Sequence, residues 1–115
     1  MSNTIDRDAL RQALDSGRKP QLVEALPAAY YEQGHLPGAV NIPHDAVNAL
    51  APSLLPDKQA DIVVYCASET CRNSDYAAQR LVALGYASVR TYVGGKADWT
   101  GAGLPLETDA ARSVA

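Results

Sequence analysis

Residues 62–65, with the sequence IVVY, form the clearest apolar run of the chain, and no polar residue interrupts them. β-branched and aromatic side chains favour strands, and a strand without polar alternation is typical of a parallel sheet covered on both faces. The stretch 61–66 is therefore predicted to be a buried strand. Shorter strands are predicted at residues 21–25, 39–42 and 88–93.

Two longer segments place their apolar residues at helical spacing, residues 6–17 and residues 74–85. The first opens on an aspartate that can cap a helix, and each of them ends on a glycine. Short helices or helical turns are predicted at residues 27–34, 45–56 (broken by Pro52 and Pro56) and 96–103.

The predicted strands and helices alternate along the chain, which is typical of an open α/β sheet with mostly parallel strands and helices on both faces. A length of 115 residues with 47% hydrophobic residues provides one core. We expect a single domain over residues 1–108 and a loosely ordered tail at 109–115. The sequence does not indicate the oligomeric state.

Charge and hydropathy exclude several classes of partner. The formal net charge is -3, and the ten lysines and arginines are scattered along the chain, which argues against binding to nucleic acid or to an anionic membrane surface. No segment approaches the roughly 20 apolar residues of a membrane helix. The first ten residues lack the pattern of a secretory signal, so a cytoplasmic location is expected.

The chain contains two cysteines and two histidines, Cys66, Cys71, His35 and His44. Two cysteines do not make a disulfide scaffold in a domain of this size. A structural zinc needs four ligands, and the C-x4-C spacing resembles no common zinc motif. We therefore expect neither a metal nor another cofactor.

Cys66 follows the buried strand directly, and in an open α/β sheet ligands bind at the carboxyl ends of the strands. A loop from this cysteine to the helix near Ser74 would direct main-chain N–H groups and the helix dipole at the sulfur. Both stabilise a thiolate, so we expect Cys66 to be an accessible catalytic nucleophile with a depressed pKa. The alternative is that Cys66 is a small buried apolar residue at the end of a strand.

The residues that follow Cys66 are predicted to bind an anionic substrate. Arg72 can grip two oxygens of an anion, Ser74 can cap the helix or donate to the anion, and Glu69 is expected to point to solvent. Cys71 is either a passive loop residue or a resolving thiol toward Cys66. The predicted binding residues are Ala67, Ser68, Glu69, Thr70, Cys71, Arg72, Asn73 and Ser74.

Three motifs resemble the rhodanese (sulfurtransferase) superfamily. They are GHLPGAVNIP at residues 34–43, the apolar strand leading into Cys66, and YVGG at residues 92–95 with Trp99, Gly103 and Pro105 after it. The resemblance implies five parallel strands with helices on both faces. It also implies transfer of sulfane sulfur from a small anionic donor such as thiosulfate or polysulfide, through a persulfide on Cys66, to cyanide or to a thiol, which a carrier protein can provide.

The chain departs from the family pattern at two places. Residues 24–26 read EAL where the family usually has Asp-x-Arg, so the usual basic partner is missing. The loop is longer than usual, and the spacing from Cys66 to Arg72 equals the C-x5-R of cysteine phosphatases and arsenate reductases. Oxyanion chemistry is therefore a second hypothesis, and a non-catalytic protein-binding module is a third. His35 and Trp99 are expected to have structural roles.

Overall fold

Five parallel strands make one sheet in the computed structural model, which describes residues 3–108. The strand order is β1-β5-β4-β2-β3. The strands are β1 Thr4–Ile5, β2 Gln21–Glu24, β3 Val40–Asn41, β4 Asp61–Tyr65 and β5 Ser88–Tyr92. The predicted parallel α/β sheet is thereby confirmed, and the predicted tail at 109–115 lies outside the described residues.

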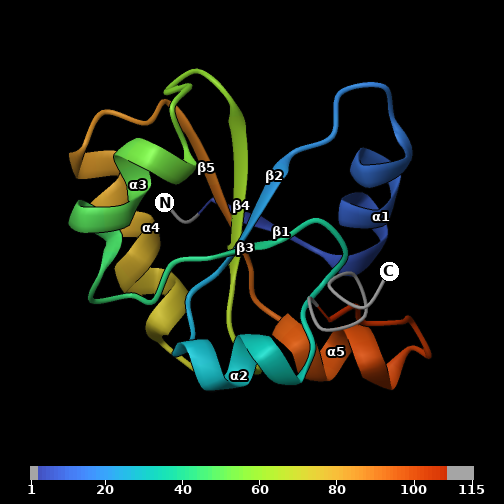
Figure 1. Ribbon diagram of the computed structural model, residues 1–115. Coiled ribbons are helices and arrows are strands. Elements are labelled where there is room, and N and C mark those ends of the chain that lie inside the picture. Colours follow the sequence, from blue (N-terminus) through green and yellow to red (C-terminus); the bar gives the residue numbers. More distant parts are fainter. Residues whose placement is uncertain (1–2, 109–115) are drawn as a thin grey trace, which may run out of the picture.

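Five helices surround the sheet (Figure 1): the first four connect successive strands, and the fifth follows the last strand. They are α1 Arg7–Asp15, α2 Ala28–Gln33, α3 Val47–Leu54, α4 Asn73–Ala83 and α5 Gly95–Gly101. In Figure 1, α3 and α4 lie on one side of the sheet and α1 and α5 lie on the other. Helices cover the sheet because parallel strands all start at the same end, so that the chain must cross over the sheet between one strand and the next.

The central strand β4 is buried on both faces, as the absence of polar alternation predicted. Ile62 and Val64 belong to the core shared with α3 and α4. Val63 and Tyr65 belong to the core shared with α1 and α5. Each of these four side chains has an exposed fraction of 0%.

Local signals set the ends of the first helix. The Asp6 carboxylate accepts a hydrogen bond from the Ala9 main-chain N–H at 2.8 Å, which satisfies one of the free donors of the first turn. The helix ends with Ser16 as its C-cap, close to the predicted stop at Gly17.

The prediction that Pro52 breaks the helix in residues 45–56 is wrong. The helix α3 continues through Pro52 to Leu54, and the Leu55 N–H donates to the Ala51 carbonyl at 2.7 Å. Burial of Val47 and Ala51 against α4 and the sheet holds this short helix in place. The proline removes one donor, but its ring lies on the exposed side.

Candidate active site

Cys66 lies directly after β4, at the carboxyl end of the central strand, as predicted. The neighbouring strands β2 and β5 end at the same edge, because Glu24 and Tyr92 are both paired in register with Tyr65. Residues 67–72 form the connection to α4, which begins at Asn73. The open end of the sheet therefore places this cysteine where ligands bind in parallel α/β folds.

The side chain of Cys66 is only 2% exposed. Its sulfur lies 3.4 Å from the Ser74 hydroxyl oxygen and 3.4 Å from the Cys71 carbonyl oxygen. Burial raises the pKa of the Cys66 thiol, and its hydrogen bond with the Cys71 side chain raises it further. The hydroxyl and main-chain N–H of Ser74 lower this pKa but do not outweigh the other two effects.

The expectation of an accessible Cys66 with a depressed pKa is therefore wrong. The main physical reason is burial of the thiol, and the second cysteine adds to it. Burial by itself would raise the pKa of the Cys71 thiol. Hydrogen bonds from the Cys66 thiol and from the main-chain N–H groups of Ala67 and Asn73 bring this pKa below its ordinary value. Two of the main-chain N–H groups that were expected to donate to Cys66, those of Ala67 and Asn73, thus act on the sulfur of Cys71, and that of Ser74 acts on Cys66.

The other predicted binding residues differ in how closely they approach the two cysteines. Ser74 is buried against Cys66 and lies in the first turn of α4, but it does not cap the helix. Glu69 is exposed, as expected. The Ser68 and Thr70 hydroxyl groups hydrogen-bond to each other at 3.0 Å.

The structure does not bring Arg72 into the site. Its side chain is 76% exposed, and its guanidinium lies 3.8 Å from the Asp75 carboxylate. An arginine in this position does not grip an anion beside Cys66. The spacing between these residues in the sequence was compatible with such a grip, but Arg72 precedes α4 immediately and its side chain extends into solvent.

A buried acidic group lies next to the site at the end of β2. Glu24 is 0% exposed, and its carboxylate accepts a hydrogen bond from the Tyr65 hydroxyl at 2.8 Å. The Lys96 ammonium group lies 3.0 Å from the other carboxylate oxygen and donates to the Tyr30 carbonyl at 2.8 Å. Burial raises the pKa of Glu24, and Lys96 and Tyr65 lower it in part.

The expected lack of a basic partner near residues 24–26 is therefore corrected: Lys96, from α5, provides the positive charge. The sequence did not reveal this lysine as the partner because it lies 72 positions after Glu24. A signal was present, because an acidic residue inside a buried strand needs a cation and few lysines are available to provide one.

The start of α5 packs on the main chain of the site. The Lys96 N–H donates to the Cys66 carbonyl at 3.0 Å, and the Ala97 N–H donates to the Ala67 carbonyl at 2.9 Å. Gly95 has a φ of +64°, and a Cβ at this position would lie 2.4 Å from the Cys66 carbonyl oxygen. This close approach requires glycine, which explains the second glycine of the YVGG motif.

His35 and Trp99 pack inside the protein. The His35 ring is fully buried, stacks on Tyr31 with a centroid distance of 3.9 Å and lies 3.6 Å from the Glu107 carboxylate. Trp99 is 5% exposed, packs edge-on against Tyr92 and donates from its indole N–H to the Pro105 carbonyl at 2.8 Å. These contacts support the structural roles expected for both residues.

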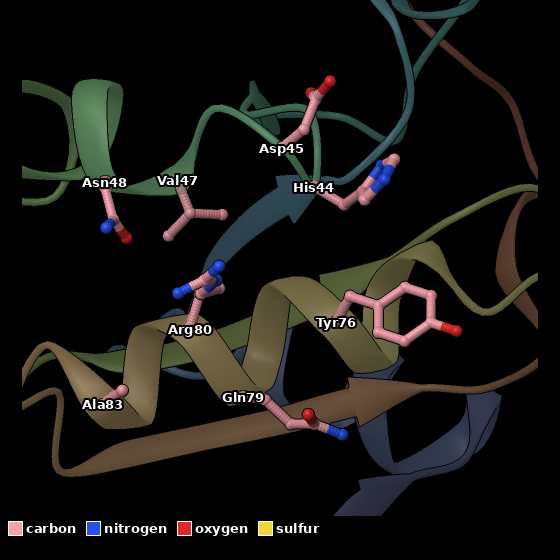
Figure 2. A pocket seen from close by; sticks show the side chains of 8 residues that line it. All are labelled: His44, Asp45, Val47, Asn48, Tyr76, Gln79, Arg80 and Ala83. Carbon is pink, nitrogen blue, oxygen red and sulfur yellow. The ribbon is translucent and has the colours of Figure 1, made fainter.

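A hollow of about 650 Å³ lies between α4 and the segment that leads into α3 (Figure 2). Figure 2 shows Tyr76, Gln79 and Arg80 on α4, with the Arg80 side chain extending toward Val47 and Asn48. None of the residues predicted to bind substrate lines it. The lining residues are His44, Asp45, Val47, Asn48, Tyr76, Gln79, Arg80 and Ala83.

Residues 3–108 contain no cluster of three or more His, Cys, Asp or Glu side chains that is suited to hold a metal ion. No helix in this part of the chain combines the length and apolar character needed to cross a bilayer.

The fold and the site define a parallel α/β protein with a cysteine at the end of its central strand. Comparison with known families then identifies the family. Residues 6–102 match the model of the rhodanese-like domain. The chain therefore belongs to the rhodanese-like family, and the resemblance seen in the sequence motifs is confirmed.

Individual relatives agree with this membership. A protein of Allochromatium vinosum named sulfurtransferase is 33% identical over 106 residues, which cover 92% of this chain and 95% of that protein. YrkF of Bacillus subtilis is 32% identical over 97 residues, 84% of this chain, but the chain spans only 50% of its length. The crystal structure of the Bacillus halodurans protein BH2092 superposes with a TM-score of 0.84 at 26% identity, covering 93% of this chain and 77% of that one.

Proposed function

We propose that this protein is a sulfurtransferase that carries sulfane sulfur as a persulfide on Cys66. The observation that carries the proposal is the position of Cys66 at the carboxyl end of β4, with its thiol hydrogen-bonded to the carbonyl of a second cysteine, Cys71, at 3.4 Å. Membership of the rhodanese-like family and the likeness to a sulfurtransferase along nearly its whole length support the same chemistry.

The cysteine pair provides a way to ionise the buried thiol. Hydrogen bonds from Ala67 and Asn73 favour the thiolate on Cys71. As a donor such as thiosulfate approaches, the Cys71 thiolate accepts the proton of Cys66 along their shared hydrogen bond. The Cys66 thiolate then attacks the outer sulfur of the donor, the bond between the two donor sulfurs breaks, and sulfite leaves with the electron pair.

The buried sulfur needs an opening through which the donor can reach it. Ala67, Glu69, Thr70 and Arg72 are exposed and Cys71 is half-buried, whereas Cys66 is 2% exposed. A displacement of this loop is therefore part of the proposal. The donor is a small anion, and the thiol acceptor and its carrier are not specified by the site.

The first prediction tests this proposal at its first chemical step. Mixing the protein with excess thiosulfate, without any acceptor, should release about one equivalent of sulfite per chain in a burst. Cys66→Ser should release none, because the oxygen nucleophile is not ionised. Val82→Ser, a serine substitution on the exposed side of α4, serves as the control and should match wild type.

Sulfite release that persists in Cys66→Ser would contradict the proposal. It would also be contradicted if wild type releases no sulfite from thiosulfate and shows no persulfide in its intact mass after treatment with polysulfide. Cys66-dependent hydrolysis of an aryl phosphate would instead favour oxyanion chemistry. The exposed position of Arg72 gives that alternative no support.

A further inference from the structure

The two cysteine sulfurs of this protein lie at opposite ends of one loop that folds back on itself. The Cys71 N–H donates to the Ser68 carbonyl at 3.1 Å, which closes a turn and brings Cys71 back toward the end of β4. The Cys66 thiol donates to the Cys71 carbonyl oxygen at 3.4 Å, which places the second cysteine directly beside the first. The interaction of the two thiols raises the pKa of Cys66 and lowers that of Cys71. Both cysteines are free thiols.

The loop holds Cys71 in the form needed for attack on sulfur. Main-chain N–H groups of Ala67 and Asn73 donate to its sulfur, and the pKa of Cys71 lies below the ordinary value although partial burial alone would raise it. Cys71 is half-buried and more exposed than Cys66. A thiol with these properties, adjacent to a second sulfur, is the typical partner in sulfur exchange.

We propose that Cys71 is the first acceptor for the persulfide on Cys66, and that the product is a Cys66–Cys71 disulfide with release of hydrosulfide. This inference rests on the proposed sulfurtransferase function, because it requires the persulfide to form. It assigns to the longer loop of this chain a chemical role, the internal resolution of the persulfide.

The step balances without an external oxidant. After sulfite has left, Cys66 carries the persulfide anion and Cys71 carries the proton that it accepted. The Cys71 proton passes to the outer sulfur, the Cys71 thiolate attacks the Cys66 sulfur, a bond forms between the two cysteine sulfurs, and the bond from Cys66 to the outer sulfur breaks. The outer sulfur leaves with the electron pair as hydrosulfide, so that it is reduced and the Cys71 sulfur is oxidised, while the Cys66 sulfur keeps the oxidation state that it had in the persulfide.

Three products separate this step from the one before it. Reduced protein is mixed with thiosulfate under anaerobic conditions, and sulfite, sulfide and the intact protein mass are followed in time. Wild type should release about one equivalent of sulfite and then about one equivalent of sulfide, and its mass should fall by about 2 Da as the disulfide forms. Addition of a small dithiol reductant should restore the starting mass and permit another cycle.

Cys71→Ser should stop after the first product. Because Cys71 also accepts the Cys66 proton in the first step, we expect sulfite release to be slower than in wild type, followed by a persistent mass gain of about 32 Da for the persulfide and at least a tenfold lower yield of sulfide per sulfite released. The decisive comparison is with Cys71→Ala, which removes the same sulfur without introducing a hydroxyl. Incubation without thiosulfate controls for air oxidation and should leave the wild-type mass unchanged.

The outcomes distinguish the two proposals. Wild type that releases sulfite but keeps the persulfide, with no sulfide and no disulfide, would overturn the role of Cys71 and leave the proposed function intact. Sulfide release from both Cys71 variants at the wild-type yield would overturn it as well. If wild type releases no sulfite from thiosulfate and gains no persulfide mass with polysulfide, the proposed function itself fails.

If the Cys71 variants do not fold, wild type alone still decides. Disulfide formation that is coincident with sulfide release supports the inference, and peptide mapping without reduction must then find residues 66 and 71 in one cross-linked peptide.

Discussion

Glu24 is a fully buried carboxyl group whose charge depends on one lysine from a distant part of the chain. Its oxygens contact the Tyr65 hydroxyl and the Lys96 ammonium group. Breaking a buried ion pair by removing one partner leaves a charge that neither water nor protein compensates. Glu24 and Tyr65 end the strands β2 and β4 beside Cys66. The ion pair between Glu24 and Lys96 therefore supports the site as well as the fold.

Lys96→Met is therefore predicted to lower the free energy of unfolding by about 3 kcal/mol near neutral pH. The loss should depend on pH. Burial raises the folded-state pKa of Glu24 above its ordinary value, so its contribution is fully present below that ordinary value and is lost as pH rises through the folded pKa. Without Lys96 that pKa rises further, so the deficit should grow as pH rises above the ordinary pKa of a glutamate.

Denaturant unfolding at several pH values measures this effect. Lys19→Met removes the same charge from an exposed position and should change stability by less than about 0.5 kcal/mol. Combining Lys96→Met with Glu24→Gln should abolish the growth of the deficit with pH. A deficit that is constant with pH in the single variant would show that the ion pair with Glu24 is not its cause.

At the scale of elements, the contact between α5 and the Cys66 main chain connects the third sequence motif to the cysteine. Helix α5 starts at Gly95, and its first N–H groups donate to the carbonyl groups of Cys66 and Ala67. This contact fixes the direction in which the chain leaves β4. It depends on the absence of a side chain at Gly95.

Gly95→Ala should destabilise the protein by at least about 1–2 kcal/mol from its positive φ alone. The added Cβ, 2.4 Å from the Cys66 carbonyl oxygen, should increase that loss and displace the loop, so that sulfite release slows. Gly101→Ala is the matched control in the same helix, because no atom lies within 4 Å of its added Cβ. Thermal unfolding of both variants tests the contact, and equal melting temperatures would contradict it.

At the scale of the whole molecule, β4 joins the two cores. It pairs with β2 on one side and β5 on the other, and its side chains alternate between the core of α3 and α4 and the core of α1 and α5. The edge strands β1 and β3 contain two residues each. Opening β4 therefore requires disruption of both cores, whereas an edge strand can open locally.

Native-state hydrogen exchange should show this difference. Main-chain N–H groups of β4 should exchange only through global unfolding, with protection equal to the full free energy of unfolding, and those of β3 should exchange at least about tenfold faster through local opening. Exchange of β4 as fast as that of β3, under the same conditions, would contradict a core that unfolds as one unit.

Most elements of the fold were predictable because their signals are local. The uninterrupted apolar run at 62–65, the Asp6 cap and the glycine-terminated helix of residues 74–85 each correspond to an element of the structure. The strand β1 was not predicted, because two residues give no measurable alternation. The helix through Pro52 was not predicted either, because packing of its neighbours, not propensity, maintains it.

The sequence by itself determined the parallel α/β sheet, the position of Cys66 at the end of its central strand and the family, because apolar periodicity and short motifs are properties of neighbouring residues. Only the tertiary structure decided which cysteine receives the loop amides, that Arg72 faces solvent and that Lys96 neutralises Glu24. Charge, burial and hydrogen bonding at a site depend on groups that folding brings together from distant positions. Their balance therefore cannot be read from the spacing of residues along the chain.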